Sequence, residues 1–207
     1  MPKMIFLQLL KVSNMAKKYI AHILFILTLA WVSHAENYVV DKSHSAVIFG
    51  IQHMGLGKTY GRFNDFSGGI NFDESSLKKS KIVLSIKTAS VDTDNKKRDD
   101  HLRNSDFFDA GTYSVMSFNS TSIEKIPGKK DVYKVTGQFT LLSETKVISF
   151  ELKKVGAGMH VFAKKPAIGF EAQFTISRKD FDFGKGKAAG AVGDEVSVIV
   201  SLEAIAK

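Results

Sequence analysis

The sequence predicts an all-β fold, an antiparallel barrel or sandwich of about eight strands, with one short helix near one end. Two observations carry this prediction. Apolar and polar residues alternate in short runs, which is typical of half-buried strands, and turn signals rich in glycine separate these runs. The chain has 207 residues, a length that suggests one domain or at most two. No linker, repeat or low-complexity tract divides it.

The strand prediction rests on runs in which every second residue is apolar, since residues two apart share a face of a strand. The first run places Val47, Phe49 and Ile51 on one face. The runs are 45–53, 81–87, 115–120, 131–141, 146–152, 167–177 and 195–204, and the turn signals are Gly55-Leu-Gly57, Gly68-Gly69, Pro127-Gly128, Gly156-Ala-Gly158 and Gly184-Lys-Gly186. The pattern leaves open which face of each strand points inward, because a shift of one residue exchanges the two faces.

Residues 93–108 break the alternation and suit a short helix. The segment is highly charged, and Thr93 or Asn95 can cap its start, because their side-chain oxygens accept hydrogen bonds from free backbone N–H groups. Phe107 and Phe108 give it an apolar end. We expect this helix to lie across the mouth of a barrel.

Residues 1–35 read as an N-terminal extension followed by a cleaved signal peptide. Lys17 and Lys18 precede an apolar run over 20–32, and Ser33 and Ala35 are the small residues that signal peptidase requires. The run is shorter than the roughly 20 residues that span a bilayer, so a membrane anchor is the weaker alternative. We expect export with cleavage after Ala35, and we expect Met15 to be the true start, because the signal is complete from there.

The charge of the remaining domain argues against nucleic-acid binding. The whole chain has a net charge of +8, and residues 1–35 hold four lysines and no acid, so residues 36–207 keep a net charge of +4. This value is ordinary for a soluble protein. Short basic pairs such as Lys78-Lys79, Lys153-Lys154 and Lys164-Lys165 lie near predicted turns. We interpret them as solubilising, with contact to anionic lipid head groups as the weaker alternative.

No motif predicts catalysis or metal binding. The chain has no cysteine, which excludes a disulfide scaffold, a cysteine-ligated metal site and a cysteine nucleophile. The histidines of the exported domain, His44, His53, His101 and His160, do not form a tight ligand motif. A nucleophile elbow and a phosphate-binding loop are also missing from the sequence. We therefore expect a protein that is not an enzyme and needs no metal or cofactor.

Several segments together resemble the YceI family of periplasmic polyisoprenoid-binding proteins, over nearly all of residues 38–204. The matching segments are Asp41-Lys-Ser-His44-Ser45, Gly61-Arg-Phe63-Asn-Asp-Phe66-Ser-Gly68, the long signature Ser90 to Asp109, and Ser177-Arg-Lys-Asp-Phe181 with Val192 to Val196. The long signature is the most specific of these. The chain departs from the family at Ser114, where proline is usual, and at Ser143 and Val147, where a turn usually has glycine and proline.

The resemblance implies a single lipocalin-like barrel over residues 36–207, located in the periplasm. It also implies an apolar tunnel that binds, stores or transports a long isoprenoid lipid, either a polyprenyl or a quinone-like molecule. We assign the tunnel wall to Phe49, Ile51, Phe63, Phe66, Phe118, Phe139, Phe150, Phe170 and Phe174, and the closure of one end to Leu102, Phe107 and Phe108. Plain core packing is the alternative for any single phenylalanine.

The remaining assignments concern polar groups. His53, Arg98, His101 and Arg103 either meet the lipid head group or anchor the helix to the barrel, and an ion pair of Arg98 with an aspartate of the signature (Asp99, Asp106 or Asp109) favours anchoring. The expected partner is an isoprenoid lipid, with transient membrane contact and a homodimer as further options. Two alternatives stay open: a stress-related structural or interaction protein, and a binder of another amphiphile such as a fatty acid or fatty amide.

Overall fold

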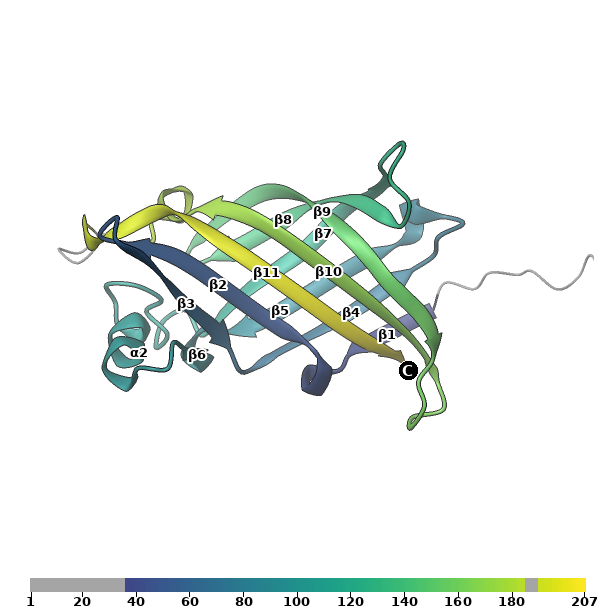
Figure 1. Ribbon diagram of the computed structural model, residues 1–207, viewed down its shortest axis with the longest axis horizontal. Helices are drawn as coiled ribbons and strands as arrows, with labels where there is room; N and C mark the ends of the chain where they lie inside the picture. Colours follow the sequence, from purple (N-terminus) through teal and green to yellow (C-terminus); the bar gives the residue numbers. More distant parts are fainter. Residues whose placement is uncertain (1–35, 185–189) are drawn as a thin grey trace, which may run out of the picture. The chain divides into compact units, whose positions relative to one another are not determined.

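The computed structural model describes residues 36–184 and 190–207, all within the compact unit Ala35–Lys207. The predicted signal peptide and its cleavage site lie outside these residues. No helix in the described part of the chain is long and apolar enough to cross a bilayer. One antiparallel sheet dominates the fold (Figure 1). Its strands are β1 (Glu36–Val40), β2 (Ala46–His53), β3 (Gly57–Phe63), β4 (Phe66–Phe72), β5 (Lys81–Lys87), β6 (Val91–Asp92), β7 (Val115–Lys125), β8 (Val132–Leu141), β9 (Glu144–Met159), β10 (Pro166–Ser177) and β11 (Val192–Ala206).

The sheet closes into an eight-stranded barrel because β1 pairs with β4 on one side and with β11 on the other. Tyr38, for example, lies opposite Ile70 and opposite Ala206. The other three strands extend the ring: β2 continues β1 beyond the 3₁₀ turn Lys42–His44, β3 continues β4, and β6 continues β5 beyond the 3₁₀ turn Thr88–Ser90. The predicted all-β barrel with one short helix is confirmed.

Some strand limits and turns differ from the prediction. Strand β5 has the predicted limits, whereas β7, β9 and β11 run beyond theirs, and β1, β3, β4 and the two-residue β6 are missing from the prediction. Gly68-Gly69 and Gly156 to Gly158 are wrong as turns, because both lie inside strands, β4 and β9. At Gly68 a Cβ atom would lie 2.7 Å from the carbonyl oxygen of Val83, so this glycine permits close packing. The glycines of β9 pair with Ala167 and Gly169 of β10.

The helix is shorter than predicted. Helix α2 covers Lys96–Arg103, and Asn95 is its N-cap, because the Asn95 side-chain oxygen accepts from the backbone N–H of Arg98. Thr93, the other predicted cap, instead donates from its backbone N–H and its hydroxyl to the Asp99 carboxylate. The chain then turns so that Phe107 and Phe108 are buried. Helix α2 lies at the same end of the barrel as the β2–β3 turn (Figure 1).

The β8–β9 turn is where the sequence departs from the family pattern. Leu141 pairs with Glu144, so only Leu142 and Ser143 form the turn. Leu142 has a φ of 55°, in the left-handed region that glycine adopts most readily. The hairpin therefore forms without the usual glycine, with a leucine in a conformation that L-residues disfavour.

Candidate functional site

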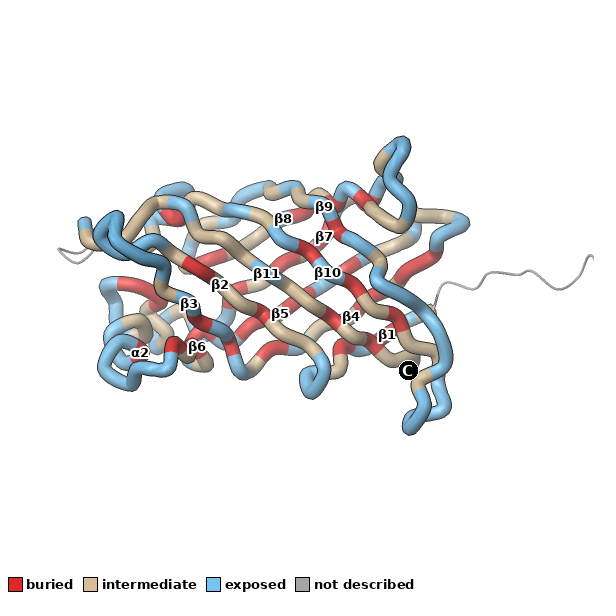
Figure 2. Tube along the Cα trace, viewed as in Figure 1, coloured by how far each residue is buried: buried red, intermediate tan, exposed pale blue. Residues whose placement is uncertain are grey.

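The barrel encloses a cavity of about 370 Å³ whose wall is almost entirely apolar. Its lining takes alternate residues from the strands, because successive side chains of a strand point to opposite faces. On β11 the lining residues include Val196, Val198, Val200 and Leu202, and on β10 they are Phe170, Ala172, Phe174 and Ile176. Figure 2 shows the resulting alternation of buried and more exposed positions along the barrel strands.

Most of the predicted wall residues line this cavity. They are Phe49, Ile51, Phe63, Leu102, Phe107, Phe108, Phe118, Phe139, Phe150, Phe170 and Phe174. The exception is Phe66, which is 6% exposed and belongs to the surrounding core. The phenylalanine-bearing faces of these strands therefore point inward. Their contact with a ligand stays a prediction.

Three groups of aromatic side chains lie along the cavity, besides the separate pair of Phe139 and Phe181 at 5.3 Å. Near helix α2, Phe63 packs 5.6 Å from Phe49 and 5.5 Å from Phe108, and Phe108 packs 4.6 Å from Phe183, as distances between ring centroids. In the middle, Phe150 lies 5.3 Å from Phe118 and stacks on Phe174 at 4.4 Å. At the far end, Phe72 packs edge-on against Tyr133 and Phe170. We call this last group, Phe72, Tyr133 and Phe170, the aromatic plug.

The aromatic plug closes the end of the barrel away from helix α2. Tyr133 and Phe170 are each 1% exposed, so their rings fill this end of the barrel interior. Outside the plug, the Lys154 ammonium contacts the carboxylate of Glu74 and lies 3.4 Å from that of Asp131. Burial opposes the charge on Lys154, yet the hydrogen bond to Glu74 and the neighbouring negative charges raise its pKa above the ordinary value. We call this the closed end.

The polar groups of the cavity gather at the other end, which we call the mouth. The side chains of His53, Thr59, Thr93, Arg98, His101 and Arg178 contribute to the lining there. They come from β2, β3, the segment around helix α2, and the 3₁₀ turn Arg178–Phe181. The mouth therefore offers hydrogen-bond donors and charge at one end of an otherwise apolar space, which suits an amphiphile with one polar end.

Arg98 does not form the predicted ion pair with Asp99, Asp106 or Asp109. Its Nε donates to the Thr93 hydroxyl and its Nη2 donates to the Thr93 carbonyl, each at 2.7 Å. The Asp99 carboxylate accepts from the same threonine, with its Oδ1 2.9 Å from the backbone nitrogen. Arg98 and Asp99 thus fix the loop before helix α2 through Thr93 rather than through each other.

His101 and Arg103 differ in their relation to the cavity. His101 lines it, with its Nε2 3.3 Å from Asp106 Oδ2 and its ring edge-on to Phe107. Arg103 does not line it, since its guanidinium donates to the carbonyls of Ala89 and Val91, both at 2.8 Å. Arg103 therefore anchors helix α2 to the β5–β6 connection, which was one of its two predicted roles.

Arg178 is a mouth residue to which the sequence assigned no role, although it lies in a segment that resembles the family. It is 6% exposed. Its guanidinium donates to the carbonyls of Phe183, Gly184, Val192 and Gly193 and to the Asp194 carboxylate. A buried guanidinium with several carbonyl acceptors holds loops in place through charge-assisted hydrogen bonds. The alternation pattern could have identified further lining residues, such as Ile148 and Ile176, but not Arg178.

Among the described residues, one group of histidine and acidic side chains is close enough together to hold a metal ion. Asp41, His44 and Glu203 place their ligand atoms within 4.8 Å of one another. Asp41 and His44 already form a pair, with His44 Nδ1 2.8 Å from Asp41 Oδ2. The hydrogen bond between them raises the pKa of His44 and lowers that of Asp41. None of the three lines the cavity, and the absence of a resident metal stays a prediction.

The sequence comparisons identify one family. A model of the YceI-like domain matches residues 38–204. Protein YceI of Escherichia coli O157:H7 is 39% identical over 173 residues, which covers 83% of this chain and 87% of that protein. These matches confirm the resemblance that the sequence motifs indicate.

Two solved structures share the barrel. Burkholderia cenocepacia BcnA superposes with a TM-score of 0.70 at 27% identity, covering 79% of this chain and 98% of that one. A polyisoprenoid binding domain from Saccharophagus degradans, implicated in plant cell wall breakdown, has a TM-score of 0.63 at 17% identity and covers 84% of this chain and all of that one. The matched region contains the closed barrel, the apolar cavity and the mouth, and this chain belongs to the YceI family.

Proposed function

We propose that this protein binds, stores or transports a long isoprenoid lipid, a polyprenyl or quinone-like molecule, in the periplasm and without catalysis or a required cofactor. The observation that carries the proposal is the apolar cavity with one polar mouth and one closed end. In such a cavity an apolar tail would lie lengthwise, with its head group at the mouth. The polyisoprenoid binding domain of similar fold supports the ligand class, and the signal-like sequence over 15–35 supports export.

The energetics place selectivity at the ends of the cavity rather than along its wall. Each buried CH₂ contributes about 0.8 kcal/mol, so a tail of about 40 carbons could nominally gain about 30 kcal/mol. This exceeds the practical limit for affinity of roughly 20 kcal/mol. Apolar area therefore does not limit affinity. The length and bend of the cavity and the polar groups of its mouth decide which amphiphile binds.

The cavity volume favours a second candidate class of ligand. About 370 Å³ is near the lower limit of small-molecule pockets, which span roughly 300–1,000 Å³. A long prenyl tail is larger than this volume, so its binding requires the cavity to widen. A shorter amphiphile such as a fatty acid or fatty amide fits with less rearrangement.

Native mass spectrometry followed by organic extraction tests the proposal. The chain from Glu36 is purified, because it holds the whole closed sheet, and is then offered polyprenyl phosphate, ubiquinone and palmitate. We expect a stoichiometric adduct with a prenyl lipid. An adduct with palmitate alone would favour the second candidate, and a clean apo mass after every lipid would overturn both.

Variants locate the binding. Phe118→Glu places a charge in the wall, and we expect it to reduce lipid retention more than about tenfold, because an unpaired charge opposes an apolar tail. Val115→Glu is the matched control, since Val115 lies on the same strand but is 42% exposed. If Phe118→Glu does not fold, Phe174→Gln serves instead, since Phe174 is only partly buried. Unchanged retention in a folded variant would refute the role of that residue.

A further inference from the structure

The β9–β10 turn exposes a group of apolar side chains at the closed end. We call residues Met159–Lys165 the tip. Within it, Met159 is 64% exposed, Val161 68% and Phe162 90%. A phenylalanine that is almost fully exposed loses the free energy that burial would give it. Adjacent exposed apolar residues, unlike single scattered ones, indicate a surface that contacts another apolar phase.

The tip is held in a fixed shape by His160. The His160 backbone N–H donates to the Lys165 carbonyl at 2.8 Å, and the Lys164 N–H donates to the His160 carbonyl at 2.9 Å. The ring Nδ1 accepts from the Ala163 N–H at 2.9 Å. The neutral ring therefore carries its proton on Nε2, which lies 3.4 Å from Glu203 Oε1. Phe162 is thus presented outward by an ordered turn rather than by a loop without internal contacts.

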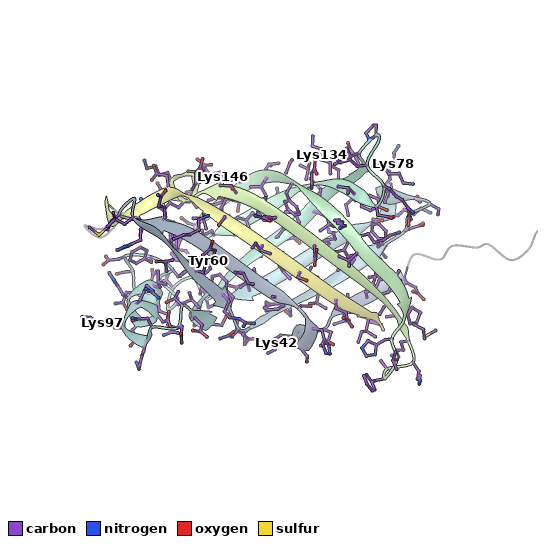
Figure 3. All side chains as sticks on the ribbon, viewed as in Figure 1. Lys42, Tyr60, Lys78, Lys97, Lys134 and Lys146 are labelled. Atoms are coloured by element: carbon purple, nitrogen blue, oxygen red, sulfur yellow. The ribbon has the colours of Figure 1, made fainter. Side chains whose placement is uncertain are left out.

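The charged side chains of the tip itself are both lysines. Lys164 and Lys165 are exposed, and neither has a carboxylate within 4.0 Å among the described residues. Some acids of this end pair with lysines, Glu74 and Asp131 with Lys154 and Glu151 with Lys129, and Glu203 lies beside the His160 ring. Glu36, Asp73 and Glu124 also belong to this end, outside the tip, and form no ion pair among the described residues. Lys78 also lies at this end (Figure 3). Exposed apolar side chains flanked by unpaired lysines complement the interface of a bilayer that contains anionic lipids.

We propose that the tip docks the barrel on anionic lipid surfaces. Val161 and Phe162 enter the interfacial layer, and Lys164 and Lys165 contact the phosphate groups above it. This inference does not depend on the ligand of the cavity. The tip lies at the end of β11 opposite the mouth, since Ala167 pairs with Ile205 whereas His53 pairs with Val192. Strand β11 has 15 residues, which span roughly 50 Å at about 3.3 Å each. The docked barrel therefore keeps its mouth clear of the surface that holds it.

Vesicle co-flotation tests this proposal. The chain from Glu36 is used, because the apolar run over 20–32 would bind vesicles by itself. Vesicles are either phosphatidylcholine alone or a mixture with one fifth phosphatidylglycerol. We expect binding to the mixed vesicles, and a loss of roughly tenfold or more for Phe162→Ser, because the variant loses the apolar area that the ring would bury in the interface. We expect Lys164→Gln with Lys165→Gln to weaken binding to the mixed vesicles at least about tenfold, because each lysine is attracted to the anionic surface.

Leu56→Ser is the matched control. Leu56 is 88% exposed in the β2–β3 turn at the mouth, so its loss removes a similar apolar side chain from the opposite end. We expect this variant to bind like the parent. Binding that depends on Leu56 but not on Phe162 would overturn the proposal, as would no binding at all. If the parent sediments as a dimer and Phe162→Ser as a monomer, without vesicle binding, a second copy covers the tip and the proposal is wrong.

Discussion

The two ends of the barrel are built from different interactions. At the closed end, the aromatic plug is buried and the charges outside it pair with each other, as Lys154 does with Glu74. At the mouth, the arginines donate mainly to backbone oxygens: Arg103 to those of Ala89 and Val91, and Arg178 to several loop carbonyls. Aromatic rings pack at both ends. The mouth adds charge-assisted hydrogen bonds from arginines to loop carbonyls, whereas the closed end adds ion pairs.

The closed end and the mouth therefore have different roles: the first contributes to folding stability, and the second leaves room for a ligand. A plug of fully buried rings contributes the free energy of burial and closes the cavity. A mouth made of loops held by guanidinium groups keeps its shape without filling the space that a ligand needs. The sequence assigned Arg98 and Arg103 either to a lipid head group or to anchoring the helix. In the structure, at least some of their N–H groups donate to oxygens of the protein itself. The apolar wall between the two ends is left free of competing polar groups.

The largest expected effect comes from the plug. We predict that Phe170→Ala lowers the free energy of unfolding by about 3–5 kcal/mol, because it leaves a cavity in a fully buried site. Phe174→Ala, four residues along β10, should lower it by less, because that ring is only partly buried whereas Phe170 is 1% exposed. Urea unfolding of both variants measures the difference. Equal losses would mean that the closed end is not the more tightly packed one.

The next effect concerns the mouth. We predict that Arg178→Lys lowers the free energy of unfolding by about 2 kcal/mol, because an ammonium cannot reproduce the fork of donors that serves several carbonyls. Amide hydrogen exchange should rise around Val192 and Gly193 and stay unchanged in the aromatic plug. Lys179→Gln is the control, since Lys179 is exposed and forms only a surface pair with Asp194, worth less than about 1 kcal/mol. A rise in exchange at the plug would show that the two ends are not independent.

The sequence predicts much of the barrel and less of its ends. Alternation identifies the long strands because their inner faces are apolar throughout, and the same phase points Phe118 and Phe150 inward. Alternation does not identify strands β3 and β4, because Gly61, Gly68 and Gly69 interrupt the alternation of apolar and polar residues there. These positions carry no side chain for a structural reason: at Gly61 a Cβ atom would lie 2.4 Å from the Phe49 ring. Such contacts form only after the sheet closes, and no local pattern contains them.

The polar residues of the mouth are the least predictable part of the site. Charge pairing within the signature favours an ion pair for Arg98, but the folded chain offers the Thr93 carbonyl and hydroxyl at 2.7 Å. The sequence cannot indicate which backbone carbonyl will accept a hydrogen bond, because every residue has a carbonyl. The roles of Arg98, Arg103 and Arg178 therefore depend on where the loops lie.

The smallest expected effect is the pH dependence of the stability that the Glu74–Lys154 pair gives the closed end. The hydrogen bond from Lys154 lowers the pKa of Glu74 below its ordinary value. A carboxyl group whose pKa is lower in the folded state stabilises the protein above its unfolded pKa of about 4.3 and loses that contribution as the pH falls through the folded value. Since the Glu74 side chain is 46% exposed, solvent screening limits the contribution to at most about 1 kcal/mol.

We therefore predict that Glu74→Gln is less stable than the parent at pH 7 and that the difference shrinks toward zero near pH 3. Urea unfolding at both pH values measures this change. Glu171→Gln is the matched control, because Glu171 is an exposed β10 residue without an ion pair among the described residues, so the same substitution there removes no charge pair. A difference for Glu74→Gln that persists at pH 3 would mean that packing beside Tyr133, rather than the charge pair with Lys154, is what this carboxylate contributes to the closed end.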